Sequence, residues 1–225
     1  MQSLPPSATT VERVYDSILD AICNGQMAPG ERIAQDIVAE KLNVSRQPVG
    51  QALMILKKQS FVREAGRRGL IVAPLEAKFI AAVYEFRSAV DPLASSLAAK
   101  HVTADAKAEG ERIIAAGKKA LASGSLQRLI GADMDFHVLI YSMSGNILVQ
   151  EVMTTYWHHL RRAMREVLKR EDYRATLWDE HQDIWTAICS GDPKRAERVM
   201  RHHVLAASDF LERQVLHALE ERDKK

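Results

Sequence analysis

The stretch Asn43-Val44-Ser45-Arg46-Gln47-Pro48-Val49 decides the fold of the front of this chain. Ser45 is a residue type that favours a helix N-cap, and Pro48 falls in the first helical turn, where proline is tolerated. Apolar residues then recur at helical spacing, at Val49, Ala52, Leu53 and Leu56. The stretch therefore predicts a helix over Ser45–Lys58.

Working outward from this helix, the neighbouring segments complete a compact motif. Two amphipathic helices are expected before it, over Val11–Asn24 and Ala34–Leu42, the second with Ile37, Val38 and Leu42 inward. After it, the β-type runs Phe61–Arg63 and Leu70–Val72 flank Ala65-Gly66-Arg67-Arg68-Gly69, which predicts a hairpin. The order predicts a winged helix-turn-helix in residues 11–75, after a disordered lead-in over residues 1–10.

Positive charge gathers in this motif. Residues 1–75 hold nine Lys and Arg against seven Asp and Glu, so the net charge of +2 of the whole chain lies in the front third. A winged helix lays its second helix in the major groove of DNA and its wing along the backbone. The DNA contacts expected here are Ser45, Arg46, Gln47, Lys57, Arg67, Arg68 and Gly69. The alternative is a solvated basic face on an ordinary domain.

From residue 76 to residue 220 the pattern is helical throughout. Short breaks with Gly, Ser or Pro separate six expected helices, which predicts an antiparallel bundle. The helices are expected over Phe79–Ala99, Ala104–Ala122, Ser125–Ser142, Ile147–Lys169, Asp172–Cys189 and Asp192–Leu219, with a local kink at Pro92.

The cellular compartment is indicated by simple features. The two cysteines, Cys23 and Cys189, stand in separate helical patterns, which is typical of free thiols in a reducing compartment. No apolar run approaches the roughly 20 residues of a membrane span, and the first ten residues lack an apolar secretion signal. We expect a cytoplasmic protein without a membrane partner.

Three strings in the front domain resemble the amino-terminal domain of GntR-type bacterial transcription regulators: Pro29–Ile33, Val44–Val49 and Arg68–Val72. The remainder resembles the FCD ligand-binding domain of the FadR branch, through Phe86-Arg87, Asp133–His137, Glu180-His181 and Met200–His203. The resemblance implies a homodimer that binds palindromic operator DNA and responds to a small molecule. Most relatives repress and release DNA when the ligand binds.

The chain departs from the family pattern at three positions. The family usually has a second arginine where this sequence has Gly50, commonly a glutamate at Gln35, and a glycine at Ser60. Glycine inside a helix costs roughly 1 kcal/mol of helix propensity. The operator sequence therefore cannot be carried over from relatives.

A candidate metal site follows from spacing and resemblance together. Asp133 and His137 are four residues apart, so both project from one face of a helix. Asp135 is the competing carboxylate, but a spacing of two residues points it away. The resemblance adds His181 and His203, and such a set suits zinc or nickel best, with manganese or iron as alternatives. Read by spacing alone, these histidines are ordinary core or surface residues.

The resemblance also implies a pocket for a small organic acid. Its expected contacts are Arg87 and Arg161, since guanidinium groups bind carboxylates in a bidentate manner, with a weaker contribution from the Tyr84 hydroxyl. The alternatives are an ion pair between Arg87 and Asp91, one helical turn apart, and a solvated arginine face around Arg161.

We interpret the chain as a homodimeric, ligand-responsive DNA-binding transcription regulator, most simply a repressor, and not as an enzyme. The sequence contains no catalytic nucleophile arrangement and no phosphate-binding glycine loop. Two rival hypotheses remain. One is a metal-dependent enzyme that acts on a small acid. The other is a DNA-binding protein whose helical domain is inert.

Overall fold

The structure is a computed structural model that describes residues 9–168 and 171–223. The chain divides into two compact units, Met1–Leu75 and Glu76–Lys225. Residues 1–8, where most of the expected lead-in falls, lie outside the described residues. The described part is mainly α-helical, as predicted.

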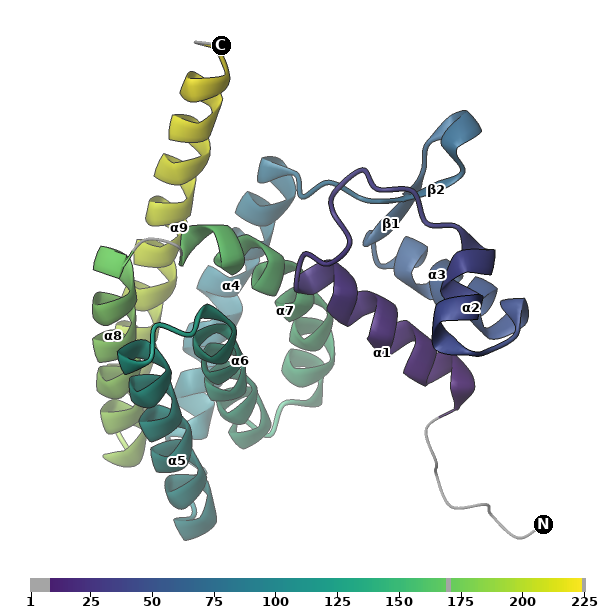
Figure 1. Cartoon of the computed structure of the whole chain (residues 1–225). Helices are drawn as coiled ribbons and strands as arrows, with labels where there is room; N and C mark the ends of the chain where they lie inside the picture. The colour runs from purple at the N-terminus through teal and green to yellow at the C-terminus, as the bar shows by residue number, and fades with distance from the viewer. Residues whose placement is uncertain (1–8, 169–170, 224–225) are drawn as a thin grey trace, which may run out of the picture. The chain divides into compact units, whose positions relative to one another are not determined.

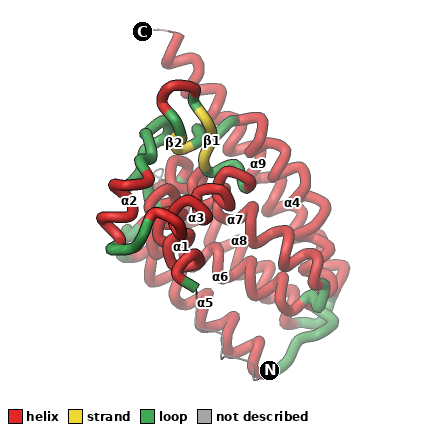
Figure 2. The backbone as a smooth tube through the Cα atoms, turned by 90° about the vertical axis from the view of Figure 1, so that its right-hand side faces the viewer, coloured by secondary structure: helices red, strands yellow, loops and turns green. Residues whose placement is uncertain are grey.

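Unit 1 is a winged helix-turn-helix (Figure 1). Helices α1 (Thr10–Cys23), α2 (Gln35–Leu42) and α3 (Arg46–Lys58) precede strands β1 (Val62–Glu64) and β2 (Leu70–Val72). The strands pair antiparallel with Val62 opposite Val72, and a short 3₁₀ turn, Gly66–Arg68, joins them at the tip of the wing (Figure 2). The predicted order of helices and hairpin is confirmed.

Helix α1 begins at Thr10, one residue earlier than predicted, because Thr9 caps it. The Thr9 side chain accepts a hydrogen bond from the Glu12 backbone N–H, and the Glu12 carboxylate accepts one from the Thr9 N–H at 2.6 Å. This reciprocal pair is a capping box, and its Thr-x-x-Glu pattern was readable in the sequence.

The core of unit 1 forms where α3 meets α1. Val49, Ala52, Leu53 and Leu56 are buried, as their helical spacing predicts. The prediction for Ile37 was wrong, because this side chain is 52% exposed. Helix α2 has only eight residues, and Ala39 is the side chain it buries, which leaves Ile37 on its outer side.

The turns on either side of α3 differ in two details from the prediction. Ser45 occupies the N-cap position with extended backbone, but its side chain makes no capping hydrogen bond. At the other end Ser60 adopts a left-handed backbone with φ of 64°. Glycine adopts this conformation at no steric cost, which gives a physical reason for the family's preference there.

The described residues of unit 2 form six helices, as predicted (Figure 1). Their bounds are α4 (Ala77–Ala98), α5 (Ala104–Ala122), α6 (Leu126–Met143), α7 (Ile147–Val167), α8 (Glu171–Cys189) and α9 (Pro193–Asp223). Helix α9 therefore runs four residues past its expected end. Across the described residues, no helix combines the length and apolarity that crossing a membrane requires.

Helix α4 continues through Pro92, and α9 compensates for the proline. Proline has no N–H, so the carbonyl of Ser88, four residues earlier, loses its helical partner. The Arg201 guanidinium of α9 donates to that carbonyl at 3.1 Å. The hydrogen bond links α4 to α9, which pack side by side.

Two glycines on α5 receive two tryptophans from α8. A Cβ on Gly117 would lie 1.5 Å from the Trp178 ring, and one on Gly110 would lie 2.0 Å from the Trp185 ring. The two glycines are seven residues apart on α5, and the two tryptophans are seven residues apart on α8. The two rings therefore lie on one face of α8. The Trp178 indole N–H also donates to the Ile114 carbonyl at 3.1 Å. Only glycine leaves room for this packing, which fixes α8 against α5.

Candidate metal centre and DNA-contact surface

Four polar side chains from three helices meet inside unit 2. Asp133 and His137 come from α6, His181 from α8 and His203 from α9, and each is at most 2% exposed. One nitrogen from each histidine lies within 4.8 Å of the others, and Asp133 Oδ1 lies 3.3 Å from His181 Nε2. These are the four residues predicted as metal ligands.

Several of these buried atoms have no hydrogen-bond partner within the described protein. They are Asp133 Oδ2, His137 Nδ1 and both ring nitrogens of His181. Buried polar atoms are nearly always paired, since an unpaired one costs about 1–3 kcal/mol. A carboxylate and three imidazoles, two of which carry unpaired ring nitrogens, are a donor set that fits a divalent transition metal.

Burial also sets the protonation states that metal binding requires. Burial, with the nearby Arg87 charge adding to it, holds the pKa values of His137 and His181 well below their usual range. Burial raises the pKa of Asp133 to about 6, opposed by Coulombic interactions with His203 and with the Arg87 guanidinium. At neutral pH both histidines are therefore neutral and Asp133 is mostly ionised, which is the ligating form of each group.

Glu180 is a site residue that the sequence reasoning missed. His203 Nδ1 lies 2.7 Å from Glu180 Oε2, and this histidine is 2% exposed. A carboxylate beside Nδ1 accepts a hydrogen bond from the Nδ1–H, which fixes the tautomer and leaves Nε2 as the ligand atom. The signal was present, since Glu180 stands next to His181, but the residues that pair lie 23 positions apart on different helices.

Aromatic rings hold His181 in place. Its ring packs edge-on against Trp178 at 4.7 Å between centroids and lies tilted against Phe136 at 4.6 Å. Because Trp178 is seated against Gly117, the glycine–tryptophan packing of α5 and α8 also sets the position of His181.

Arg87 and Tyr84 lie beside the histidines, as predicted. Arg87 also forms the ion pair with Asp91 that was the alternative interpretation of this arginine. Arg87 Nε donates to Asp91 Oδ2 at 2.8 Å, and its guanidinium stacks between Tyr84 and Trp157. Nη2 lies 2.8 Å from the same oxygen without hydrogen-bond geometry. Asp91 also accepts from the Tyr141 hydroxyl at 2.7 Å. The two interpretations of Arg87 are therefore compatible, because one donor remains free.

The cavity at this site is small. Its volume is about 20 Å³, and its lining includes Tyr84, Arg87, Asp133, His137, Met164 and His203. That volume holds one water or ion rather than an organic acid. Among the described residues, Arg161 is not part of the lining. The buried residues of α7 include Trp157, Leu160 and Met164, whereas Arg161 is only half-buried.

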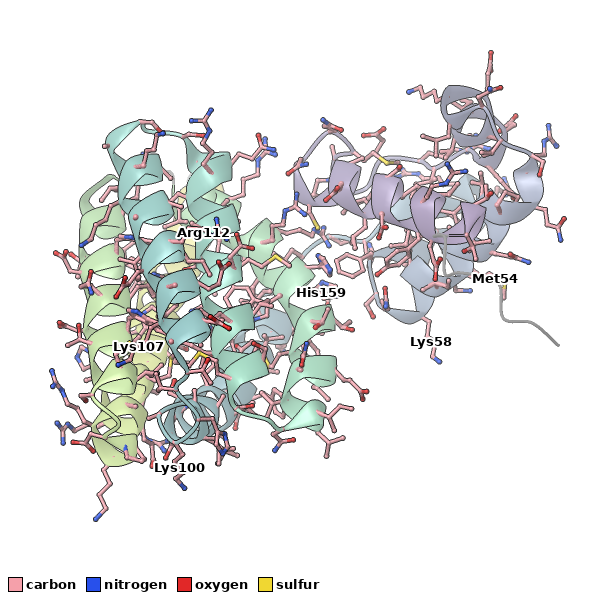
Figure 3. All side chains as sticks on the ribbon, turned by 90° about the horizontal axis from the view of Figure 1, so that it is seen from below. Met54, Lys58, Lys100, Lys107, Arg112 and His159 are labelled. Carbon is pink, nitrogen blue, oxygen red and sulfur yellow. The ribbon has the colours of Figure 1, made fainter. Side chains whose placement is uncertain are left out.

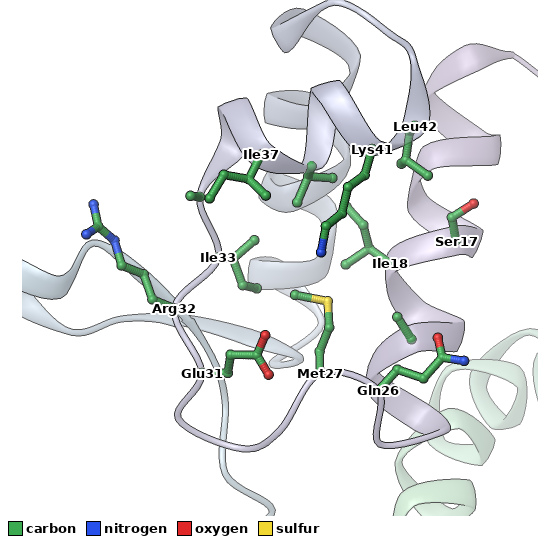
Figure 4. Close-up of a pocket in the computed structure, with 13 residues that line it drawn as sticks. Ser17, Ile18, Gln26, Met27, Glu31, Arg32, Ile33, Ile37, Lys41 and Leu42 are labelled. Atoms are coloured by element: carbon green, nitrogen blue, oxygen red, sulfur yellow. The ribbon is translucent and has the colours of Figure 1, made fainter.

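Unit 1 contains a larger hollow of its own. It has a volume of about 480 Å³ between α1 and α2, and Figure 4 shows Ile18, Met27, Ile33 and Ile37 around it with the Lys41 amine reaching across. The candidate ligand groups of unit 2 thus line a small cavity, whereas this hollow of unit 1 is lined mainly by apolar side chains.

The predicted DNA contacts lie on the surface of unit 1. Arg46 and Gln47 are exposed in the first turn of α3, after the exposed N-cap Ser45. Further along α3, Met54 and Lys58 project outward (Figure 3). Arg67 and Arg68 form the 3₁₀ turn at the wing tip, and Gly69 follows with φ of 72°. Helix and wing tip therefore present the basic groups that the prediction requires.

Lys57 has a competing partner. Its amine hydrogen-bonds to the Glu64 carboxylate on β1, and both side chains are exposed. The pair ties α3 to the wing, and the Lys57 charge is partly neutralised before any DNA arrives. Its role in DNA binding stays a prediction.

Two family descriptions match the chain. The one described as "Bacterial regulatory proteins, gntR family" covers residues 10–72, and the one described as "FCD domain" covers residues 82–206. Together they span both compact units.

Individual relatives agree with the family match. An "Uncharacterized HTH-type transcriptional regulator in unstable DNA locus" of Streptomyces ambofaciens is 28% identical over 92% of this chain and 87% of its own. A "Probable D-xylose utilization operon transcriptional repressor" of Paenarthrobacter nicotinovorans is 25% identical over 88% of this chain and 87% of its own. The solved structure of E. coli McbR/YncC has a TM-score of 0.82 at 17% identity, over 93% and 100% of the two chains, which supports the fold.

Proposed function

The chain belongs to the gntR family of bacterial regulatory proteins with an FCD domain, and from that premise we propose how its DNA binding is controlled. It is a DNA-binding transcription regulator and not an enzyme, since the family and its named relatives are regulators. In the proposal, a divalent metal and a small carboxylate bound inside unit 2 change the affinity of unit 1 for operator DNA. The rival interpretation as a metal-dependent enzyme is given up.

The observation that carries the proposal is the convergence of Asp133, His137, His181 and His203, of which the first three carry unpaired buried ligand atoms. Zinc or nickel is the preferred metal, because three imidazoles and one carboxylate match their ligand preferences, and manganese or iron are the alternatives. The metal would supply a Lewis-acidic centre for an acid. The residues of the chain hold it, and Arg87 offers the free guanidinium donor beside it.

The small cavity gives the proposal its switching step. An organic acid does not fit into about 20 Å³, so its entry must displace lining side chains such as Met164 and Leu177. Methionine is flexible and adapts easily to such a change. Ligand binding is thereby coupled to a rearrangement of α7 and α8, and by linkage the acid and the DNA must affect each other's affinity equally.

Repression is the expected sign of control, and the cytoplasm is the expected compartment. The Paenarthrobacter relative is named a transcriptional repressor, which supports repression in this chain. A regulator of this kind acts where the DNA is, which in bacteria is the cytoplasm.

We further propose a homodimer on a palindromic operator, because one winged helix reads only a half-site. Helices α4 and α7 share an apolar surface, and the rings of Phe86 and Tyr156 meet across it at 6.0 Å. The exposed apolar side chains on this surface are Phe86, Leu93, Leu148 and Val152. A second copy of the chain is the proposed partner. Sedimentation should detect a dimer that Leu93→Glu weakens and that Leu205→Glu, an exposed leucine on α9, leaves intact.

The deciding experiment is thermal unfolding of the purified protein as isolated, after a chelator, and with zinc, nickel, manganese or iron(II) added back. Each form is then tested against small sugar acids, hydroxy acids and dicarboxylates. A ligand at 100 times its Kd should stabilise the protein by about 2.7 kcal/mol. The matched variants are His203→Ala and His202→Ala, the latter an exposed neighbour on α9.

A chelator-sensitive shift with one acid, lost in His203→Ala and kept in His202→Ala, would support the proposal. That acid should then release DNA from the wild-type protein. If no metal, no acid and no chelator changes the melting temperature, the chain is a DNA-binding protein with an inert helical domain.

A further inference from the structure

Gln35 and Gly50, two positions at which the chain departs from the family pattern, lie against each other in unit 1. Gln35 is the first residue of α2, and Gly50 lies in the second turn of α3. A Cβ added to Gly50 would lie 2.9 Å from Gln35 Nε2. The glutamine amide therefore occupies the space that a side chain at position 50 would take.

The orientation of this amide is set by a hydrogen bond. Gln35 Nε2 donates to the backbone carbonyl of Arg46 at 2.5 Å. A carbonyl can only accept, so the nitrogen must face Arg46 and the oxygen must face away. Within the described chain, Gln35 Oε1 has no hydrogen-bond partner, and the side chain is exposed. One N–H and one C=O of the amide thus remain available at the protein surface.

The location of the amide is the start of the helix that enters the DNA groove. In helix-turn-helix proteins the N-terminal residues of the second helix contact base edges. Gln35 is bonded to Arg46, the first residue of α3, and lies over Gly50 on the next turn. An amide with a free N–H and a free C=O can pair with N7 and N6 of adenine in the major groove.

We propose that Gln35 is a specificity-determining DNA contact, which reads one base pair in each half-site through the amide held between Arg46 and Gly50. Gly50 is required because any larger side chain would occupy the space that the Gln35 amide takes. The contact carries no charge, so it contributes to base preference and not to the neutralisation of phosphates.

The competing explanation is that the hydrogen bond only ties α2 to α3. Such a tie would affect the stability of unit 1 and leave base preference untouched. Gly50→Ala separates the two explanations, because the added methyl displaces the flexible end of Gln35 while alanine favours the helix. This variant should fold at least as well as the wild type and still lose the contact.

The test selects binding sites from a random pool of double-stranded DNA with the full-length wild type, Gln35→Ala and Gly50→Ala. Affinities are then measured on the wild-type site and on versions with each base pair replaced. The expected result is that discrimination at one base pair per half-site falls by about tenfold in both variants. Discrimination at other positions and the dependence of affinity on salt should stay as in the wild type. Gln26→Ala, in the loop between α1 and α2, is the matched control.

Undiminished discrimination at every base pair in both variants would overturn the inference and leave the structural tie. A wild-type protein that selects no sequence at all would remove sequence-specific DNA binding and the inference with it. The two failures are distinguishable, because the first leaves a clear wild-type motif.

Discussion

The two units place their candidate functional residues in opposite environments. Arg46, Gln47 and the arginines of the wing tip are exposed on unit 1, whereas Asp133 and the three histidines are buried inside unit 2. An exposed contact can be removed without disturbing packing. A buried ligand set depends on every helix around it. Function and stability should therefore separate in unit 1 and be linked in unit 2.

The strongest test of this contrast is Arg46→Ala. We expect roughly a hundredfold or greater loss of affinity for a selected operator, since each arginine–base pair is worth about 1–3 kcal/mol and a dimer has two. The melting temperature should not change, because the side chain is exposed and its backbone carbonyl still accepts from Gln35. Fluorescence anisotropy with labelled DNA measures the affinity. Unchanged operator affinity would contradict the assignment of α3.

In unit 2 the largest effect on stability is expected from Gly117→Ala. The new methyl would overlap the Trp178 ring, and forced overpacking of this kind should destabilise the protein by about 3 kcal/mol. The position of His181 should suffer as well, so metal binding should weaken in the same variant. Chemical unfolding with and without metal measures both quantities.

The matched control is Gly131→Ala. Gly131 lies in α6 with no other group within 4 Å of an added Cβ, so alanine should stabilise the helix by about 1 kcal/mol. Equal changes in stability for Gly117→Ala and Gly131→Ala would show that the packing of Trp178 does not require a glycine in α5.

A smaller and more specific effect is expected for Glu180→Leu. Loss of the carboxylate on His203 Nδ1 should lower metal affinity about 10- to 100-fold. Glu180→Gln keeps an acceptor oxygen and should retain part of the affinity, and Asp183→Leu, an exposed acid on the same helix, should retain all of it. Competition with a coloured chelator provides the measurement. Equal affinity in Glu180→Leu and the wild type would refute the positioning role.

The smallest effect is expected from Ser60→Gly in unit 1. Removing the side chain from a left-handed backbone should raise stability by about 0.5–1 kcal/mol. Asn43 has a similar backbone, with φ of 51°, but asparagine tolerates it, so Asn43→Gly should have almost no effect. Thermal unfolding compares the two, and a destabilised Ser60→Gly would show that the serine side chain has a role of its own.

Sequence reasoning predicted the helices well because apolar spacing along one element reflects local geometry. It located the ends of α3 to within one residue. The residues that it placed at helical spacing are the ones that α3 buries: Val49, Ala52, Leu53 and Leu56. It failed for Ile37, since an eight-residue helix has too few turns to show which face packs inward.

The candidate site was only partly accessible to the same reasoning. The spacing of Asp133 and His137 placed them on one face, but nothing local connects them to His181 or His203, and the resemblance supplied those two. Pairings between distant helices, such as Glu180 with His203, leave no periodic signal. The roles of the four residues as metal ligands, and of Arg161 at the effector, remain predictions.

The proline in α4 has one more consequence. The backbone of a regular helix does not fix the axial register of a neighbouring helix, because its carbonyl groups are all paired in the same way in every turn. The carbonyl that Pro92 leaves vacant at Ser88 breaks this uniformity, and Arg201 recognises it. Arg201 stands two residues before His203, and Ser88 directly follows Arg87. The unpaired carbonyl in α4 thus sets the axial register of α9, and with it the position of His203 relative to Arg87.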